Sequence, residues 1–159
     1  MDAGQVNETP RHSVSVAAAI FDDAGQNVLL IKRRDNGNWE PPGGVLELDE
    51  TIEDGLRREV REETGAEIEV GPLTGVYKNM TRGIVALVFR AKLESEPKSS
   101  SNEASEVRWM PLELLPKLMA EAYALRLTDA DPTESVARRP SVREHDGTSI
   151  LSDGGRREL

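Results

Sequence analysis

The sequence of 159 residues has the length of one domain, and its hydrophobic fraction of 37% is enough to bury a core. Cysteine is absent, which excludes disulfides, a thiol nucleophile and cysteine-bound metals, and apolar runs such as Val16–Phe21 are far shorter than the roughly 18 residues of a membrane helix. With 20 Lys and Arg against 29 Asp and Glu, the net charge of −9 disfavours long nucleic acids as partners but not a small phosphate compound that arrives with a cation.

The chain is expected to have three parts. These are a polar lead-in at residues 1–11, a folded domain at 12–128, and a polar tail at 129–159 that could pack near a cleft. The N-terminus has no basic patch followed by an apolar stretch, so we expect no secretory signal and a cytoplasmic location. The sequence predicts no membrane partner and is compatible with a homodimer.

The first predicted elements are two strands joined by a turn. Val14–Phe21 and Val28–Ile31 are rich in apolar residues typical of strands, and Asp22–Asn27 between them are turn formers. Trp39–Gly44 follows with two adjacent prolines and two adjacent glycines. We therefore expect no regular structure in that segment.

A helix is predicted at Thr51–Thr64. An apolar residue recurs there every fourth position, at Ile52, Leu56 and Val60. Asp49 or Thr51 could cap its start, and Gly65 is a natural stop after the last turn.

Strands are predicted for the stretch after the helix. They lie at 68–70, 73–77 and 84–93, with a short one at 106–110 after a charged, serine-rich loop. Residues 84–89 are almost entirely apolar, which is typical of a central strand covered on both faces.

A second helical region is expected from Pro111, followed by the tail. Beyond Asp129 the chain has few large apolar residues, so we expect it to pack weakly, with at most one short helix or an extended arm. Within the tail, Arg138–Asp146 could fold over a cleft, and the alternative is a solvated segment.

Three carboxylates gather at the end of the predicted helix. Glu59, Glu62 and Glu63 are spaced i, i+3 and i+4, so they lie on neighbouring positions near the negative end of the helix dipole. Such crowding indicates a hard divalent cation with oxygen ligands, Mg²⁺ or Mn²⁺. The alternative is a solvated charged face.

The sequence around these carboxylates carries a longer motif. From Gly44 it has five residues, Glu50, seven residues and then Arg58-Glu59-Val60-Arg61-Glu62-Glu63-Thr64-Gly65-Ala66. This matches the pattern G-x5-E-x7-R-E-U-x-E-E-x-G-U, where U is aliphatic, and the chain therefore resembles the Nudix hydrolase family. The resemblance implies an α/β fold, an αβα sandwich with a mixed β-sheet. The predicted helix and the Pro111–Leu127 region would cover its two sides, with the family domain at 12–128.

The resemblance also implies roles for residues of the motif. The divalent metal, Mg²⁺ or alternatively Mn²⁺, would be held by the Gly44 carbonyl, Glu59, Glu62 and Glu63. Glu50 and Arg58 would form an ion pair that fixes the loop to the helix.

The catalytic candidates are Glu63, Glu62 and Glu103. Glu63 is the first candidate for the base that deprotonates water. Glu103, six residues before Trp109, is the loop alternative, and Glu106 is a weaker one.

Candidates for substrate binding lie before the motif. Arg33 and Arg34 could hold phosphates, because arginine pairs with phosphate oxygens. Trp39 could stack on a base, although packing is its more common role. His12 and His145 have no second histidine at ligand spacing, so neither is assigned to a metal.

The resemblance implies hydrolysis of a nucleoside diphosphate linked to another moiety, by attack of water on phosphorus. The substrate would be a modified nucleoside triphosphate, a nucleotide sugar or a dinucleotide. Met80 stands where one subfamily has proline and Tyr77 falls too early for another, which favours the triphosphate. The alternatives are a nucleotide sensor without activity and an enzyme acting on capped RNA, the latter disfavoured by the acidic charge.

Overall fold

A computed structural model of the chain describes residues 8–133 and 139–152. Most of the predicted lead-in and two parts of the tail, 134–138 and 153–159, lie outside the described residues. The strands are β1 (Ser13–Ile20), β2 (Asn27–Arg33), β3 (Trp39–Glu40), β4 (Gly43–Val45), β5 (Ile68–Asn79), β6 (Ile84–Leu93), β7 (Ala104–Pro111), β8 (Ser141–His145) and β9 (Ile150–Ser152). The helical elements are α1 (Ile52–Thr64), the 3₁₀ turn η2 (Leu112–Leu114), α2 (Leu115–Leu118) and α3 (Glu121–Thr128).

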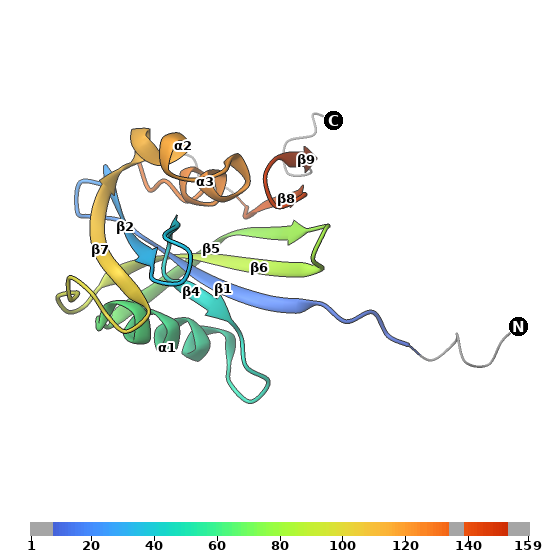
Figure 1. Cartoon of the computed structure of the whole chain (residues 1–159), viewed down its shortest axis with the longest axis horizontal. Helices are drawn as coiled ribbons and strands as arrows, with labels where there is room; N and C mark the ends of the chain where they lie inside the picture. Colours follow the sequence, from blue (N-terminus) through green and yellow to red (C-terminus); the bar gives the residue numbers. More distant parts are fainter. Residues whose placement is uncertain (1–7, 134–138, 153–159) are drawn as a thin grey trace, which may run out of the picture.

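The described strands form two sheets between two helical layers. The larger sheet has the order β4-β1-β6-β5-β8-β9, and the smaller one has the order β3-β2-β7. The larger sheet is mixed, since β1 runs parallel to β6 while β5 runs antiparallel to it. Helix α1 lies on one side, and α2 and α3 lie on the other (Figure 1). The predicted αβα sandwich is confirmed, with its strands divided between two sheets.

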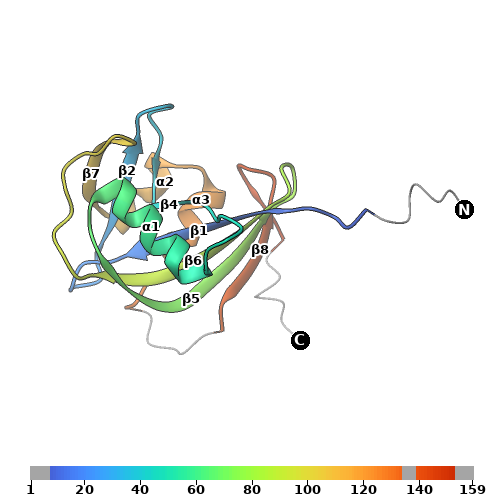
Figure 2. The ribbon, with the colours of Figure 1, turned by 90° about the horizontal axis from the view of Figure 1, so that it is seen from below.

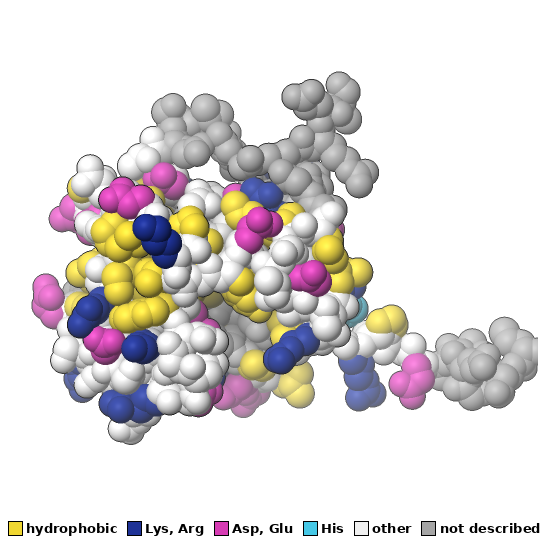
Figure 3. Space-filling view, turned by 45° about the horizontal axis from the view of Figure 1, so that its top comes forward, with side chains coloured by type: hydrophobic (Ala, Val, Ile, Leu, Met, Phe, Trp, Pro, Cys, Tyr) yellow, Lys and Arg dark blue, Asp and Glu magenta, His cyan; other side chains and the backbone are white. Residues whose placement is uncertain are grey.

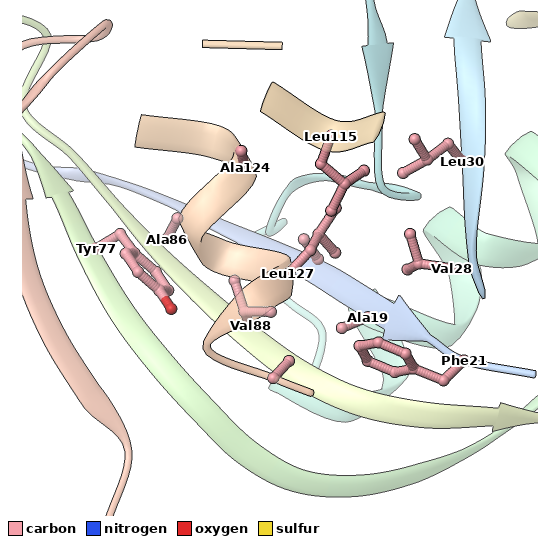
Figure 4. Close-up of a cluster of buried hydrophobic side chains, with 12 residues drawn as sticks. Ala19, Phe21, Val28, Leu30, Tyr77, Ala86, Val88, Leu115, Ala124 and Leu127 are labelled. Carbon is pink, nitrogen blue, oxygen red and sulfur yellow. The ribbon is translucent and has the colours of Figure 1, made fainter. Parts of the chain in front are cut away.

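Strand β1 explains how both sides of the sheet are filled. Ala17 and Ala19 belong to the cluster packed under α2 and α3, whereas Val16, Ala18 and Ile20 belong to the cluster under α1. This alternation is the two-residue period of a strand. Because both faces of β1 are covered, its residues form an almost continuous apolar run. Figure 4 shows the first cluster, where Leu115, Ala124 and Leu127 meet the sheet.

The motif helix α1 has the predicted ends. The Thr51 hydroxyl accepts the Asp54 N–H at 3.2 Å, and Gly65 adopts a left-handed φ of 74° that ends the helix. Leu56 and Val60 are fully buried, but Ile52 is 42% exposed, so the buried stripe is shorter than expected. Figure 2 shows α1 lying across the strands of the larger sheet.

The segment Trp39–Gly44 was expected to lack regular structure, and this is wrong at both ends. Trp39 and Glu40 pair with β2 as β3, and Gly43 begins β4, which pairs with β1. The two prolines lie between the strands, where the missing N–H groups are not needed, and the Pro42 carbonyl accepts the Ala18 N–H. The segment thus joins the smaller sheet to the larger one.

The tail is more ordered than its composition predicts. Strand β8 lies parallel to β5, from Gly75 opposite Ser141 to Asn79 opposite His145, and β9 turns back against β8. The expectation of weak packing is wrong here because polar residues form the contact. The side chain of Arg143 is buried and pairs with both carboxylate oxygens of Asp129 at 2.7 Å.

Two further details differ from the expected elements. The predicted break after Val70 is a change of register within the continuous strand β5. The second helical region is interrupted at Met119, whose extended backbone separates α2 from α3.

Candidate active site

Three carboxylates converge beside the second half of α1. Glu59 and Glu62 of the helix and Glu103 of the β6–β7 loop each place an oxygen within 4.8 Å of the others. Burial raises the pKa of Glu59, the Arg58 guanidinium opposes this, and the charges of Glu62 and Glu103 add to it. A group of oxygen donors that repel one another fits a hard divalent cation.

Arg58 connects this group to the preceding loop. Its Nε and Nη2 donate to the two carboxylate oxygens of Glu50 at 2.9 and 2.7 Å, so the predicted ion pair is present. Its Nη1 also donates to Glu59 at 3.0 Å and to Glu62 at 3.2 Å. One guanidinium therefore fixes the loop and holds two carboxylates in place.

Glu63 lies beside the group of three carboxylates but outside it. It is buried, and its Oε1 accepts the Gly43 N–H at 2.7 Å. Burial raises its pKa to about 8, against that hydrogen bond and with help from nearby carboxylates. Together with Glu59 and Glu103 it lines a cavity of about 500 Å³. A carboxyl with such a pKa is suited to exchange a proton near neutral pH.

Gly44, which begins the motif, and Gly43 before it are both approached closely by neighbouring atoms. A Cβ on Gly44 would lie 2.6 Å from the carboxylate carbon of Glu59, and one on Gly43 would lie 2.2 Å from the Val16 carbonyl oxygen. Only glycine lets this strand come so near both the carboxylate and β1. Gly44 is thus adjacent to the group of carboxylates, as its expected role requires.

Arg33 and Arg34 line the same cavity, but their guanidinium groups have different hydrogen-bond partners. Arg33 is paired with Asp35 and Glu40, at 2.8 Å from its Nε and 3.0 Å from its Nη1. The Arg34 guanidinium donates through its Nε, to the Ser101 carbonyl at 2.8 Å. Its Nη1 and Nη2 make no hydrogen bond within 8–133 or 139–152, so they are available to a phosphate.

A second cavity, of about 740 Å³, lies near the Arg33–Glu40 ion pair. Its walls include Trp39, Glu40, Tyr123 and the turn between β8 and β9. Trp39 also packs against the hydrophobic core, so it contributes to both the core and the cavity wall. Hydrophobic side chains lie among acidic and basic ones on the face that carries α2 and α3 (Figure 3).

A buried cation fixes one wall of the second cavity. The Arg126 guanidinium lies 5.3 Å from the Tyr77 ring and 4.7 Å from the Tyr123 ring, and its Nη2 is 3.2 Å from Nε2 of His145. Burial lowers the pKa of Arg126 and of His145. The Gly147 N–H donates to Nδ1 of His145 at 2.9 Å, which requires this ring nitrogen to be unprotonated.

Comparison with known proteins agrees with this geometry. The family model for the NUDIX domain matches residues 11–130. The chain belongs to the Nudix hydrolase family. Members of this family generally use divalent metal ions, and the acidic group described above is the candidate site in this Nudix hydrolase.

This Nudix hydrolase is similar in sequence or structure to the following three proteins. A MutT-like protein of Streptomyces ambofaciens is 50% identical over 150 residues, which cover 94% of both chains. An ADP-ribose pyrophosphatase of Methanocaldococcus jannaschii is 36% identical over 113 residues, which cover 67% of this chain and 66% of that one. A NUDIX hydrolase structure from Nitrosomonas europaea has a TM-score of 0.73 at 25% identity and covers 87% of this chain and 82% of that one.

The structure brings most of the expected site residues of this Nudix hydrolase to one cavity. Its lining includes Arg33, Arg34, Gly44, Glu59, Glu63 and Glu103. Glu62 belongs to the acidic group but does not line this cavity, and Trp39 lines the second cavity instead. Glu106 pairs with Lys32 and Arg108, which gives it a structural role.

Glu40, Asn79 and Arg126 were missed by the sequence analysis. Glu40 directly precedes the prolines and could have been noticed, but single polar residues on strands and helices carry no local signal.

Within the described residues, no helix has the length and apolar character needed to cross a membrane.

Proposed function

We propose that this Nudix hydrolase cleaves a phosphoanhydride bond in a small nucleoside diphosphate derivative, with Mg²⁺ or alternatively Mn²⁺ as its cofactor. The observation that carries the proposal is the convergence of Glu59, Glu62 and Glu103 within 4.8 Å, beside a cavity that Arg34 also lines. Acidic groups and a guanidinium in one cavity suit a cation and a phosphate chain together.

The donor atoms present fit a divalent cation. Glu59, Glu62 and Glu103 would hold it, with the Gly44 carbonyl as the backbone ligand and Glu63 as the further expected ligand. When bound, such an ion offsets the negative charge that develops on phosphate oxygens. Manganese prefers the same oxygen ligands, so both ions belong in the test.

The protein residues would divide the remaining work. Arg34 would hold a phosphate through its free Nη atoms, while Arg33, fixed by its two carboxylates, would keep the 33–40 segment in place. Glu63 is the proposed base. It would take the proton of the attacking water, the water oxygen would bond to phosphorus, and the bridging P–O bond would break to release two phosphate products.

The two cavities support a substrate with a phosphate part and a flat second part. The first is lined by acidic and basic groups, and the second by Trp39, Tyr123 and several amides. We propose a nucleoside triphosphate with an altered base as the first candidate, and a nucleotide sugar or dinucleotide as the next. The relative named ADP-ribose pyrophosphatase is consistent with the second class.

A hydrolysis panel tests the proposal. Nucleoside triphosphates, ADP-ribose, a nucleotide sugar and a diadenosine polyphosphate are incubated with the protein and Mg²⁺, Mn²⁺ or EDTA, and released phosphate and pyrophosphate are measured. Glu69→Gln, the same change at an exposed position on β5, is the control for the glutamate variants. We expect turnover of at least one compound only with a divalent ion. Nucleotide binding without turnover of any compound would instead support a sensor.

A further inference from the structure

Asn79, the last residue of β5, is held in one orientation by the backbone that follows it. Its Oδ1 accepts the N–H groups of Thr81 at 3.0 Å and Arg82 at 3.1 Å. Because both donors are backbone amides, the amide oxygen must face them and the amide nitrogen must point the other way. The side chain cannot flip without losing two hydrogen bonds.

The amide nitrogen of Asn79 is left for a ligand. Asn79 is only 4% exposed, yet it lines the second cavity. Its Nδ2 makes no hydrogen bond with any residue in 8–133 or 139–152, and it lies 3.6 Å from where a side chain on Gly147 would begin. Because the backbone occupies Oδ1, Nδ2 is the polar atom of this side chain that is open to the cavity, where an acceptor on a ligand can replace water.

The β8–β9 turn keeps Asn79 in this place. The Met80 N–H donates to the His145 carbonyl at 2.8 Å, and the Thr81 hydroxyl donates to the Asp146 carbonyl at 2.8 Å. Both ribbon views place this turn beside the turn between β5 and β6 (Figures 1 and 2). The turn lies beyond residues 11–130, outside the part of the chain that the family model matches.

The surroundings of Asn79 suit a flat heterocycle. Tyr123 and Trp39 line the same cavity, and the Tyr123 ring is fixed between Arg126 and the edge-on ring of His145 at 5.7 Å. Aromatic faces accept any base by stacking, so they do not select among bases. Selection then depends on polar groups such as the Asn79 amide.

We propose that Asn79 is a specificity-determining residue, whose Nδ2 donates to an acceptor on the substrate base and thereby favours an oxo group over an amino group at that edge. The inference rests on the proposed function, because it assigns the second cavity to the base of the same substrate. A site built to hydrogen-bond one group rejects the analogue that lacks it, since the protein group is then left unpaired.

The test replaces Asn79 with aspartate and compares substrates that differ in one exocyclic group. Asn79→Asp keeps Oδ1 for the two backbone N–H groups but turns the donor into an acceptor. Values of kcat and KM are measured for inosine against adenosine triphosphate and for uridine against cytidine triphosphate. Gln26→Glu makes the same change from amide to carboxylate at an exposed position of the turn between β1 and β2, outside the second cavity, so it is the matched control.

We expect the wild type to prefer the oxo member of at least one pair. Asn79→Asp should lower that preference by about tenfold or more, mainly through KM, whereas Gln26→Glu should leave the ratio unchanged. If Asn79→Asp fails to fold, Asn79→Ser, whose hydroxyl can accept a backbone N–H, should bring the ratio towards one.

A ratio in Asn79→Asp within about twofold of wild type for both pairs would overturn the inference, since a lost hydrogen bond should exceed that change. Absence of turnover with every compound would instead overturn the proposed function. The same four nucleotides would then be compared by equilibrium binding to wild type and Asn79→Asp, and unchanged binding ratios would overturn the role of Asn79 as well.

Discussion

Replacing Glu103 with glutamine is predicted to stabilise the metal-free protein and to remove most of its response to Mg²⁺. Glu103 repels Glu59 and Glu62 in the acidic group when no cation is present. The amide of glutamine has the same shape but no charge. The loop should therefore keep its position while two repulsions are lost.

The size of the effect follows from the separation. Two unit charges 4.8 Å apart repel by about 0.9 kcal/mol at the dielectric constant of water, and physiological salt roughly halves this. Removing two such pairs gives about 1 kcal/mol, or a rise in Tm of about 2–4 °C for a domain of this size. In wild type, 10 mM Mg²⁺ would add about 1.4 kcal/mol for a site of roughly millimolar affinity.

Glu63 provides an internal contrast in the same experiment. Its pKa of about 8 means that it is mostly protonated at pH 7 in the metal-free protein. Glutamine resembles that neutral form but needs no proton on folding, whereas a glutamate that is ionised in the unfolded chain must be protonated, so Glu63→Gln should raise the Tm in EDTA at pH 7. Glu103→Gln thus relieves repulsion between charges, whereas Glu63→Gln relieves the cost of keeping a buried carboxyl protonated.

Thermal unfolding followed by circular dichroism measures these differences. Each variant is melted at pH 7 in EDTA and in 10 mM MgCl₂, with NaCl at matched ionic strength as the salt control. Glu69→Gln should behave as wild type in both. The reasoning fails if Glu103→Gln melts at or below wild type in EDTA and if Mg²⁺ raises both proteins equally.

Three further predictions concern the fold and the site. Arg143→Met removes the bidentate partner of the buried Asp129 carboxylate, which should lower the free energy of unfolding by about 3–5 kcal/mol and the Tm by about 10 °C. A decrease in Tm of less than a quarter of this value would contradict the packing of β8. The lowered pKa of His145 means that the unfolded chain binds more protons below pH 6.5, so stability should fall as the pH drops from 7 to 5, and denaturant titrations should show a flatter profile in His145→Gln. Gly44→Ala would push the Glu59 carboxylate aside and should reduce hydrolysis at least about tenfold with little change in the circular dichroism spectrum, whereas full activity would show that the close approach is unimportant.

The motif helix could be predicted from the sequence because its signals are local. The apolar spacing of Leu56 and Val60, the capping Thr51 and the terminating Gly65 all act within a few residues. The crowding of Glu59 and Glu62 also followed from helical spacing, since neighbouring positions on one face are fixed by the period of the helix.

The tail could not be predicted because its packing depends on distant partners. Arg143 and His145 look like surface residues in a polar segment, yet Asp129 neutralises the first and the parallel pairing with β5 covers the second. The same holds for Asn79, because the position of its Nδ2 in the second cavity depends on contacts with the β8–β9 turn. Burial of polar residues is decided by tertiary contacts rather than by composition.

The rate of phosphoanhydride hydrolysis by Glu63→Gln tests the central claim most directly. With the best nucleotide of the panel and saturating Mg²⁺, kcat should fall by at least about two orders of magnitude, because the proposed base is lost. Nucleotide binding should persist, since Arg34 and the second cavity are unchanged. Activity of Glu63→Gln near that of wild type, with Glu103→Gln inactive, would contradict the account and assign the base to the loop.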